Sequence, residues 1–87
     1  MKTLVHFTAD WCQPCKRMQP VIDKVVSEYQ GSYVKINIEK DTELFDRYTS
    51  YFGSVMSVPT LWSIQDEELV DSHIGIATED KIISMYA

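Results

Sequence analysis

The chain contains two cysteines, Cys12 and Cys15, and two residues separate them. An apolar stretch typical of a β-strand, Leu4 to Phe7, precedes them, and a pattern typical of an α-helix follows. This order places Cys12 at the amino end of a helix and Cys15 one turn along it. Residues three apart on a helix share one side, with β-carbons roughly 5–6 Å apart, so the two sulfurs can join and separate with little backbone movement. The spacing therefore indicates thiol–disulfide exchange.

The two cysteines should differ in reactivity. Unpaired amides of the first helical turn surround Cys12, and the positive end of the helix dipole favours its thiolate. We therefore expect Cys12 to be the nucleophile. Cys15 lies further into the helix and would resolve the mixed disulfide formed at Cys12. Pro14 suits this position because it lacks an N–H group that the first turn would leave unpaired.

Two other interpretations of the cysteine pair remain. Structural zinc would need two more Cys or His ligands, and the chain offers only His6 and His73. A purely structural disulfide would close a very short loop and would stabilise the fold only weakly. We expect no metal, and no bound cofactor besides the redox-active disulfide of Cys12 and Cys15.

Composition indicates a single domain over residues 1–87, of which 45% are hydrophobic. The formal net charge of −5 argues against binding nucleic acid through its phosphates or lying on an anionic membrane. The amino end, Met1-Lys2-Thr3-Leu4, has no apolar run suited to a signal peptide or a membrane span. We expect a monomer in the reducing cytoplasm, where a cysteine pair is more often reactive than structural.

Hydrophobic periodicity predicts alternating strands and helices followed by a hairpin. Pro20 should kink the first helix and Gly31 should end it. Thr42 should cap the second helix and Gly53 should close it. The predicted order is strand 4–7, helix 12–29, strand 33–38, helix 42–52, strands 60–64 and 68–74 around an acidic turn, and a last helix opened by Thr78.

This order of motifs resembles the thioredoxin family over nearly the whole chain. Residues 7–16, Phe-Thr-Ala-Asp-Trp-Cys-Gln-Pro-Cys-Lys, are similar to the family's active-site segment, and Pro20 matches its helix-kinking proline. Val58-Pro59-Thr60 matches the segment that carries the family's cis-proline, and Gly75 matches a glycine after the last strand. The resemblance implies an α/β thioredoxin fold in its minimal form, βαβαββα. The family's usual first strand and helix are missing, and three helices flank a four-stranded mixed sheet whose second strand is an exposed edge.

The resemblance also implies roles for residues outside the cysteine pair. The backbone of Val58 would pair with an extended segment of substrate. Gln13 stands where the family usually has glycine, and with Pro14 it would tune the reduction potential. The substrate-binding residues implied in this way are Trp11, Val58, Pro59 and Gly75.

His6 is the main departure from the family, because it occupies the place of a buried Asp beneath the resolving cysteine. Strand alternation points His6 toward the helix that follows Cys12. A neutral imidazole near Cys15 could accept its proton as the mixed disulfide breaks. Alternatively, His6 is a core residue whose ring nitrogens bond backbone or water. Beside this histidine, Lys35 should reach solvent, or one of the two groups should stay neutral.

The activity implied is that of a protein-disulfide reductase that carries electrons through Cys12 and Cys15. Its implied partners are a thioredoxin reductase and disulfide-containing targets such as ribonucleotide reductase. A glutaredoxin-like protein reduced by glutathione is one alternative. A thioredoxin-fold binding subunit that does not use its cysteines is another.

Overall fold

The computed structural model describes residues 2–87. Within these residues the elements follow the predicted order βαβαββα. The helices are α1 (Gln13–Tyr29), α2 (Thr42–Phe52) and α3 (Glu79–Tyr86). The strands are β1 (Thr3–Thr8), β2 (Ser32–Asn37), β3 (Thr60–Gln65) and β4 (Glu68–Ile74). This arrangement confirms the minimal thioredoxin fold expected from the sequence.

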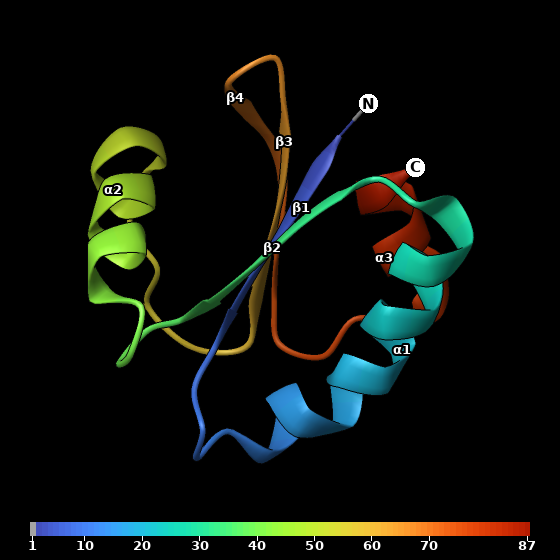
Figure 1. The fold of residues 1–87 in the computed structure, drawn as a ribbon, viewed down its shortest axis with the longest axis horizontal. Helices are drawn as coiled ribbons and strands as arrows, with labels where there is room; N and C mark the ends of the chain where they lie inside the picture. The colour runs from blue at the N-terminus through green and yellow to red at the C-terminus, as the bar shows by residue number, and fades with distance from the viewer. Residues whose placement is uncertain (1) are drawn as a thin grey trace.

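The strands form one mixed sheet in the order β2-β1-β3-β4. β1 pairs in parallel with β2 and antiparallel with β3, and β3 and β4 form an antiparallel hairpin. The parallel pair needs a crossover, which α1 supplies. Helices α1 and α3 lie on one face of the sheet and α2 on the other (Figure 1). β2 is an edge strand, as expected.

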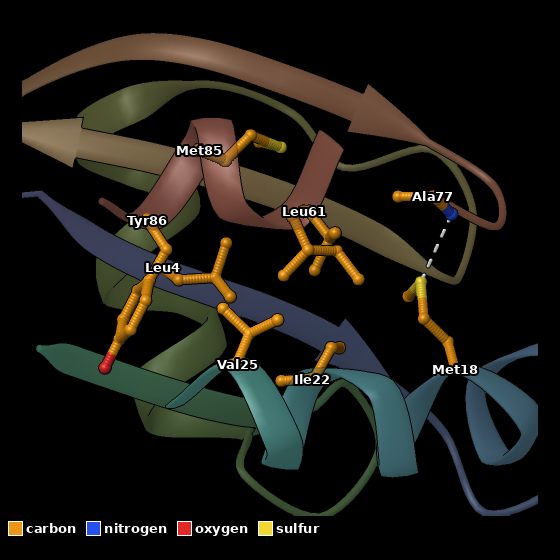
Figure 2. Packing of buried hydrophobic residues seen from close by; sticks show 9 residues of the cluster. Leu4, Met18, Ile22, Val25, Leu61, Ala77, Met85 and Tyr86 are labelled. Atoms are coloured by element: carbon orange, nitrogen blue, oxygen red, sulfur yellow. Dashed lines mark hydrogen bonds between the residues drawn. The ribbon is translucent and has the colours of Figure 1, made fainter. Parts of the chain in front are cut away.

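Each face of the sheet has its own apolar cluster. Alternation along β1 sends Leu4 to the α1 side and Val5 to the α2 side. The cluster against α1 and α3 (Figure 2) is Leu4, Met18, Ile22, Val25, Leu61, Ala77, Ile82, Met85 and Tyr86. The cluster against α2 is Val5, Phe7, Ile36, Trp62 and Ile64. By the same alternation His6, two residues after Leu4, faces α1.

α1 ends at Tyr29 as predicted, but its first residue and its C-cap residue differ from the prediction. The helix begins at Gln13, and Cys12 is its N-cap residue with extended backbone. At the other end Gln30, not Gly31, takes the left-handed conformation, with φ of 51°. The N–H of Gln30 donates to the carbonyl of Val26 at 2.8 Å, which closes the last turn one residue before Gly31.

The start of α2 also differs from the prediction. Asp41 is the N-cap residue, and Thr42 is the first residue of the helix. The carboxylate of Asp41 accepts from the N–H of Asn37 at 2.8 Å, so it stabilises the turn before the helix instead. Gly53 and Thr78 take their predicted places, at the end of α2 and the start of α3.

We predict that Ile22→Ala lowers the free energy of unfolding by about 2–5 kcal/mol, since Ile22 is fully buried between α1 and the sheet. Urea denaturation of the disulfide form measures this loss. The control is Glu28→Ala on the exposed side of α1, expected to change stability by less than about 0.5 kcal/mol. Equal effects of the two variants would contradict the assignment of the core.

Candidate active site

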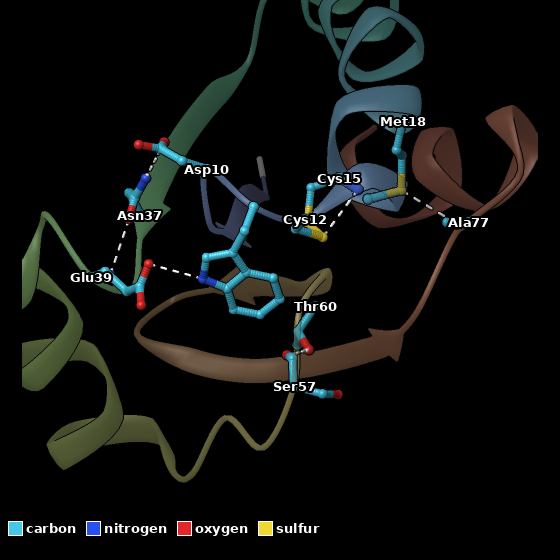
Figure 3. The surroundings of a disulfide bond; sticks show 10 residues. Asp10, Cys12, Cys15, Met18, Asn37, Glu39, Ser57, Thr60 and Ala77 are labelled. Carbon is cyan, nitrogen blue, oxygen red and sulfur yellow. Dashed lines mark hydrogen bonds between the residues drawn. A yellow bond between two sulfur atoms is a disulfide. The ribbon is translucent and has the colours of Figure 1, made fainter.

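Cys12 and Cys15 form a disulfide, with Cα atoms 5.3 Å apart (Figure 3). Cys12 lies between β1 and α1, and Cys15 lies in the first turn of α1. Both residues are buried, with exposed fractions of 3% and 1%. The structure therefore places the pair where the sequence predicted it.

Backbone amides around Cys12 hold its sulfur at the end of the helix. The N–H of Cys15 donates to Cys12 Sγ at 3.2 Å, so the sulfur takes the part of an N-cap acceptor. The carbonyl of Cys12 accepts from the N–H of Lys16 at 3.2 Å, and the N–H of Cys12 donates to Ala9 at 3.1 Å. A thiolate at this sulfur would gain the same amide and the positive end of the α1 dipole.

The loop before β3 lies against the disulfide. The Val58–Pro59 peptide bond is cis, as the resemblance implied. Val58 packs against the small cluster of Ala9, Cys12 and Cys15. The N–H of Gly75, whose φ is 91°, donates to the carbonyl of Pro59 at 2.8 Å. Val58 thus lies beside the cysteines, and the adjoining Pro59 is bonded to Gly75.

Trp11 lies at the rim of the site with 61% of its surface exposed. Its Nε1 donates to Glu39 Oε1 at 2.9 Å, which fixes the ring (Figure 3 labels Glu39). Sequence reasoning missed Glu39. The available signal was that β1 and β2 are parallel, so the loops that follow them leave the same edge of the sheet.

Asp10 is held between the same two loops, which follow β1 and β2. Its carboxylate accepts from Asn37 Nδ2 at 2.9 Å and pairs with Lys40. The hydrogen bond from Lys40 lowers the pKa of Asp10. These contacts tie the loop before Cys12 to the turn after β2.

His6 is fully buried on the α1 side of β1. Its Nδ1 lies 3.3 Å from the hydroxyl of Tyr33, and its Nε2 has no hydrogen-bond partner among residues 2–87. Burial, aided by the charge of Lys35, lowers the pKa of His6 to about 4, and Asp23 acts weakly in the other direction. The imidazole is therefore neutral near neutral pH. Lys35 reaches solvent, so the two groups avoid sharing a desolvated space, as expected.

A groove of about 520 Å³ runs between α1 and the edge strand β2. Cys15, although only 1% exposed, lies at the wall of this groove. Further lining residues are Thr8, Gln19, Asp23, Lys35 and Asn37. A second cavity, lined by Tyr48 and Tyr51 among others, lies at the opposite end of the sheet near the β3–β4 turn.

No group of three or more His, Cys, Asp or Glu side chains among residues 2–87 is arranged to hold a metal ion. In the same part of the chain, none of the helices has the length and apolar character needed to cross a membrane.

We predict that acid destabilises the fold through His6. Its pKa is about 4 when folded and 6.5 in the reference state, so unfolding takes up a proton between these values. The contribution of the neutral ring is complete above pH 6.5 and is lost as the pH falls toward 4, on the order of 3 kcal/mol in all. Urea denaturation between pH 4 and 7 would measure this slope. The carboxylates also titrate here, so the His6→Asn variant supplies the background. Superimposable profiles would contradict the lowered pKa.

Comparison with known proteins agrees with the geometry of the site. The family model for thioredoxin matches residues 1–87. Mitochondrial thioredoxin from Mus musculus is 36% identical over 81 residues, covering 91% of this chain and 46% of that protein. The chain thus spans about half the length of the mitochondrial relatives it matches.

Two further relatives match over more of their own length. Thioredoxin from Rickettsia conorii is 31% identical over 85 residues, covering 95% of this chain and 76% of that protein. The solved structure of a mutant thioredoxin from Halobacterium salinarum superposes with a TM-score of 0.80 at 30% identity, covering 97% of this chain and 70% of that one. With its cysteine pair, cis-proline and fold in the family's arrangement, the chain belongs to the thioredoxin family.

Proposed function

We propose that this chain is a thiol–disulfide oxidoreductase that reduces disulfides of target proteins, as a single-domain electron carrier of the cytoplasm. The observation that carries the proposal is the Cys12–Cys15 disulfide at the amino end of α1 in a member of the thioredoxin family. The amide of Cys15 donates to Cys12 Sγ, which favours Cys12 as the sulfur that carries the negative charge. Cys12 is then the nucleophile and Cys15 the resolving residue.

The reaction starts from the dithiol. The thiolate of Cys12 attacks one sulfur of the target disulfide, forms a mixed disulfide, and releases the other target sulfur as a thiolate. The thiol of Cys15 then loses its proton and attacks Cys12 Sγ. The second target sulfur leaves with the bonding electrons, and Cys12 and Cys15 are bridged. Two electrons have passed to the target, and a thioredoxin reductase restores the dithiol.

Burial restricts which disulfides can react. Cys12 is 3% exposed in the disulfide form, so a target must dock closely for its sulfur to reach this one. Large apolar side chains stand exposed on the loops around the site: Trp11, Met56 and Ile76. We assign substrate contact to Trp11, Val58, Pro59 and Gly75. The backbone of Val58, which precedes the cis bond, is the part suited to pairing with an extended peptide.

His6 is the proposed acceptor of the Cys15 proton. It faces α1, is neutral near neutral pH because burial lowers its pKa to about 4, and keeps Nε2 without a partner among residues 2–87. Proton transfer from a thiol requires a ring nitrogen with a free lone pair, which Nε2 would offer in the dithiol with the ring proton on Nδ1. Targets with exposed disulfides, ribonucleotide reductase among them, fit this chemistry, and a monomer suffices for it.

We predict that Cys15→Ser accumulates a mixed disulfide with a target, because Cys12 can attack but nothing resolves the product. Cys12→Ser is the matched control, since it removes the attacking sulfur and should form no adduct. Insulin serves as the target, and non-reducing electrophoresis with mass spectrometry identifies the adduct. Both variants should reduce insulin no faster than the reductant alone.

The trapping assay and two further measurements separate the proposed function from its alternatives. Equal trapping by both variants would contradict the assigned roles. Regeneration of the oxidised protein by glutathione and glutathione reductase, but not by a thioredoxin reductase, would indicate a glutaredoxin-like protein. Undiminished biological activity of the double serine variant would indicate a binding subunit.

We predict that Trp11→Ala raises KM for insulin roughly tenfold, since exposed aromatic residues at interfaces commonly contribute more than about 1 kcal/mol to binding. The rate with a small aromatic disulfide should stay unchanged. Tyr51→Ala is the control, because Tyr51 is 68% exposed but lies at the other end of the sheet. A KM raised equally by both substitutions would remove Trp11 from the substrate surface.

A further inference from the structure

A chain of hydrogen bonds links buried His6 to the surface of the protein. The Nδ1 of His6 lies 3.3 Å from the hydroxyl of Tyr33 on β2. The same hydroxyl accepts from Gln19 Nε2 at 3.1 Å. Gln19 Nε2 also donates to Asp23 Oδ1 at 2.8 Å, and Asp23 is exposed on α1. This series of hydrogen bonds therefore runs from His6 on β1 through Tyr33 on β2 to the exposed side of α1.

The chemistry of the side chains sets the direction of the two hydrogen bonds that Gln19 makes. A carboxylate only accepts, so the part of the Gln19 amide that faces Asp23 must be its NH₂ group. That NH₂ group also donates to the Tyr33 oxygen, which leaves the hydroxyl proton of Tyr33 free to point at His6 Nδ1. When this hydroxyl donates to Nδ1, the ring proton of His6 is on Nε2, the nitrogen without a partner among residues 2–87. When Nδ1 donates to the Tyr33 oxygen instead, the ring proton is on Nδ1.

The surroundings of His6 do not favour a positively charged imidazole. Across the sheet His6 lies between Lys35 on β2 and Leu61 on β3, so its neighbours supply a positive charge and no negative one. The carboxylate of Asp23 on α1 raises the pKa of His6, but burial and Lys35 outweigh it. A proton accepted at one ring nitrogen must therefore leave from the other.

Tyr33 is placed to receive that proton. Its hydroxyl is the partner of Nδ1, and its side chain is only partly buried. Gln19, which donates to this hydroxyl, and its acceptor Asp23 line the groove between α1 and β2, as does Cys15. The hydroxyl of Tyr33 thus lies between the buried imidazole of His6 and the protein surface.

We propose that Tyr33 is the proton exit of the resolving step, acting through His6 as a positioning residue. As Cys15 attacks, its thiol proton moves to Nε2 of His6, the Nδ1 proton moves to the Tyr33 oxygen, and the Tyr33 proton passes to solvent beside this partly buried side chain. Cys15 Sγ bonds to Cys12 Sγ, and the target sulfur leaves as a thiolate that takes a proton from solvent. The protons balance, and no charge is left on His6.

This proton relay through His6 and Tyr33 rests on the proposed function. It also predicts a change at His6 that disulfide exchange alone would not produce. The ring proton of His6 changes nitrogen with the redox state: it is on Nδ1 in the dithiol and on Nε2 in the disulfide. Reduction runs the steps backwards and returns the proton to Cys15.

The test uses the full chain, reduced, with dithiobis(nitrobenzoate) as the disulfide. Attack by Cys12 releases one coloured thiolate in a bimolecular phase, and attack by Cys15 releases the second in a unimolecular phase. Tyr33→Phe, which lacks only the hydroxyl, should slow the second phase roughly tenfold or more across pH 6–8 and leave the first unchanged. Tyr29→Phe, at the exposed end of α1, is the control and should alter neither phase.

Two further variants separate a relay from a packing effect. In a His6→Asn background Tyr33→Phe should cause no additional slowing, because the hydroxyl acts only through the ring. Gln19→Leu should slow the second phase to a smaller extent, since it frees the hydroxyl without removing it, and it serves if Tyr33→Phe does not fold. An unchanged second phase in Tyr33→Phe, or the same slowing in the His6→Asn background, overturns the proposal.

Nitrogen-15 NMR of His6 gives a readout that packing alone would not move. The proton should lie on Nε2 in the disulfide form and on Nδ1 in the dithiol, and Tyr33→Phe should abolish the exchange. One tautomer in both redox states overturns the relay. Failure of the proposed function looks different, because wild-type protein would then release no thiolate in the first phase.

Discussion

The bond from the amide of Cys15 to the sulfur of Cys12 is the contact on which the site depends. It satisfies an amide that the first turn of α1 would otherwise leave unpaired, and it sets the sulfur at the positive end of the helix. One contact thus starts the helix and prepares Cys12 for the nucleophilic role proposed for it. The position of that helix depends in turn on β1, whose parallel pairing with β2 requires α1 as its crossover.

The geometry of the sheet explains why distant segments meet at the cysteines. The parallel strands β1 and β2 end at the same edge, which brings Asp10 and Trp11 to the turn that holds Glu39. The antiparallel strand β3 starts at that edge, which places the Val58–Pro59 bond there too. The end of β4 follows through the hairpin and brings Gly75 to the carbonyl of Pro59.

Local pattern was sufficient to predict the element order and the position of the cysteine pair at the start of α1. Spacing of three residues and alternation of apolar residues are properties of single segments, so they can be read without the fold. Family resemblance added the cis bond at Pro59. The helix ends were less predictable, because Gln30 tolerates the left-handed backbone that Gly31 was expected to adopt. Tyr33 and Gln19 could not be assigned to His6, since their meeting depends on the rotation of α1 over β2.

Lys35 has a second consequence through its place on β2. An edge strand presents unpaired N–H and C=O groups that can recruit a strand from another molecule, and a charged side chain on such a strand opposes this. Copies of the chain that approached each other edge to edge would bring their lysines together and repel. The cation that adds to the effect of burial in lowering the pKa of His6 therefore also opposes edge-to-edge pairing at the open side of the sheet.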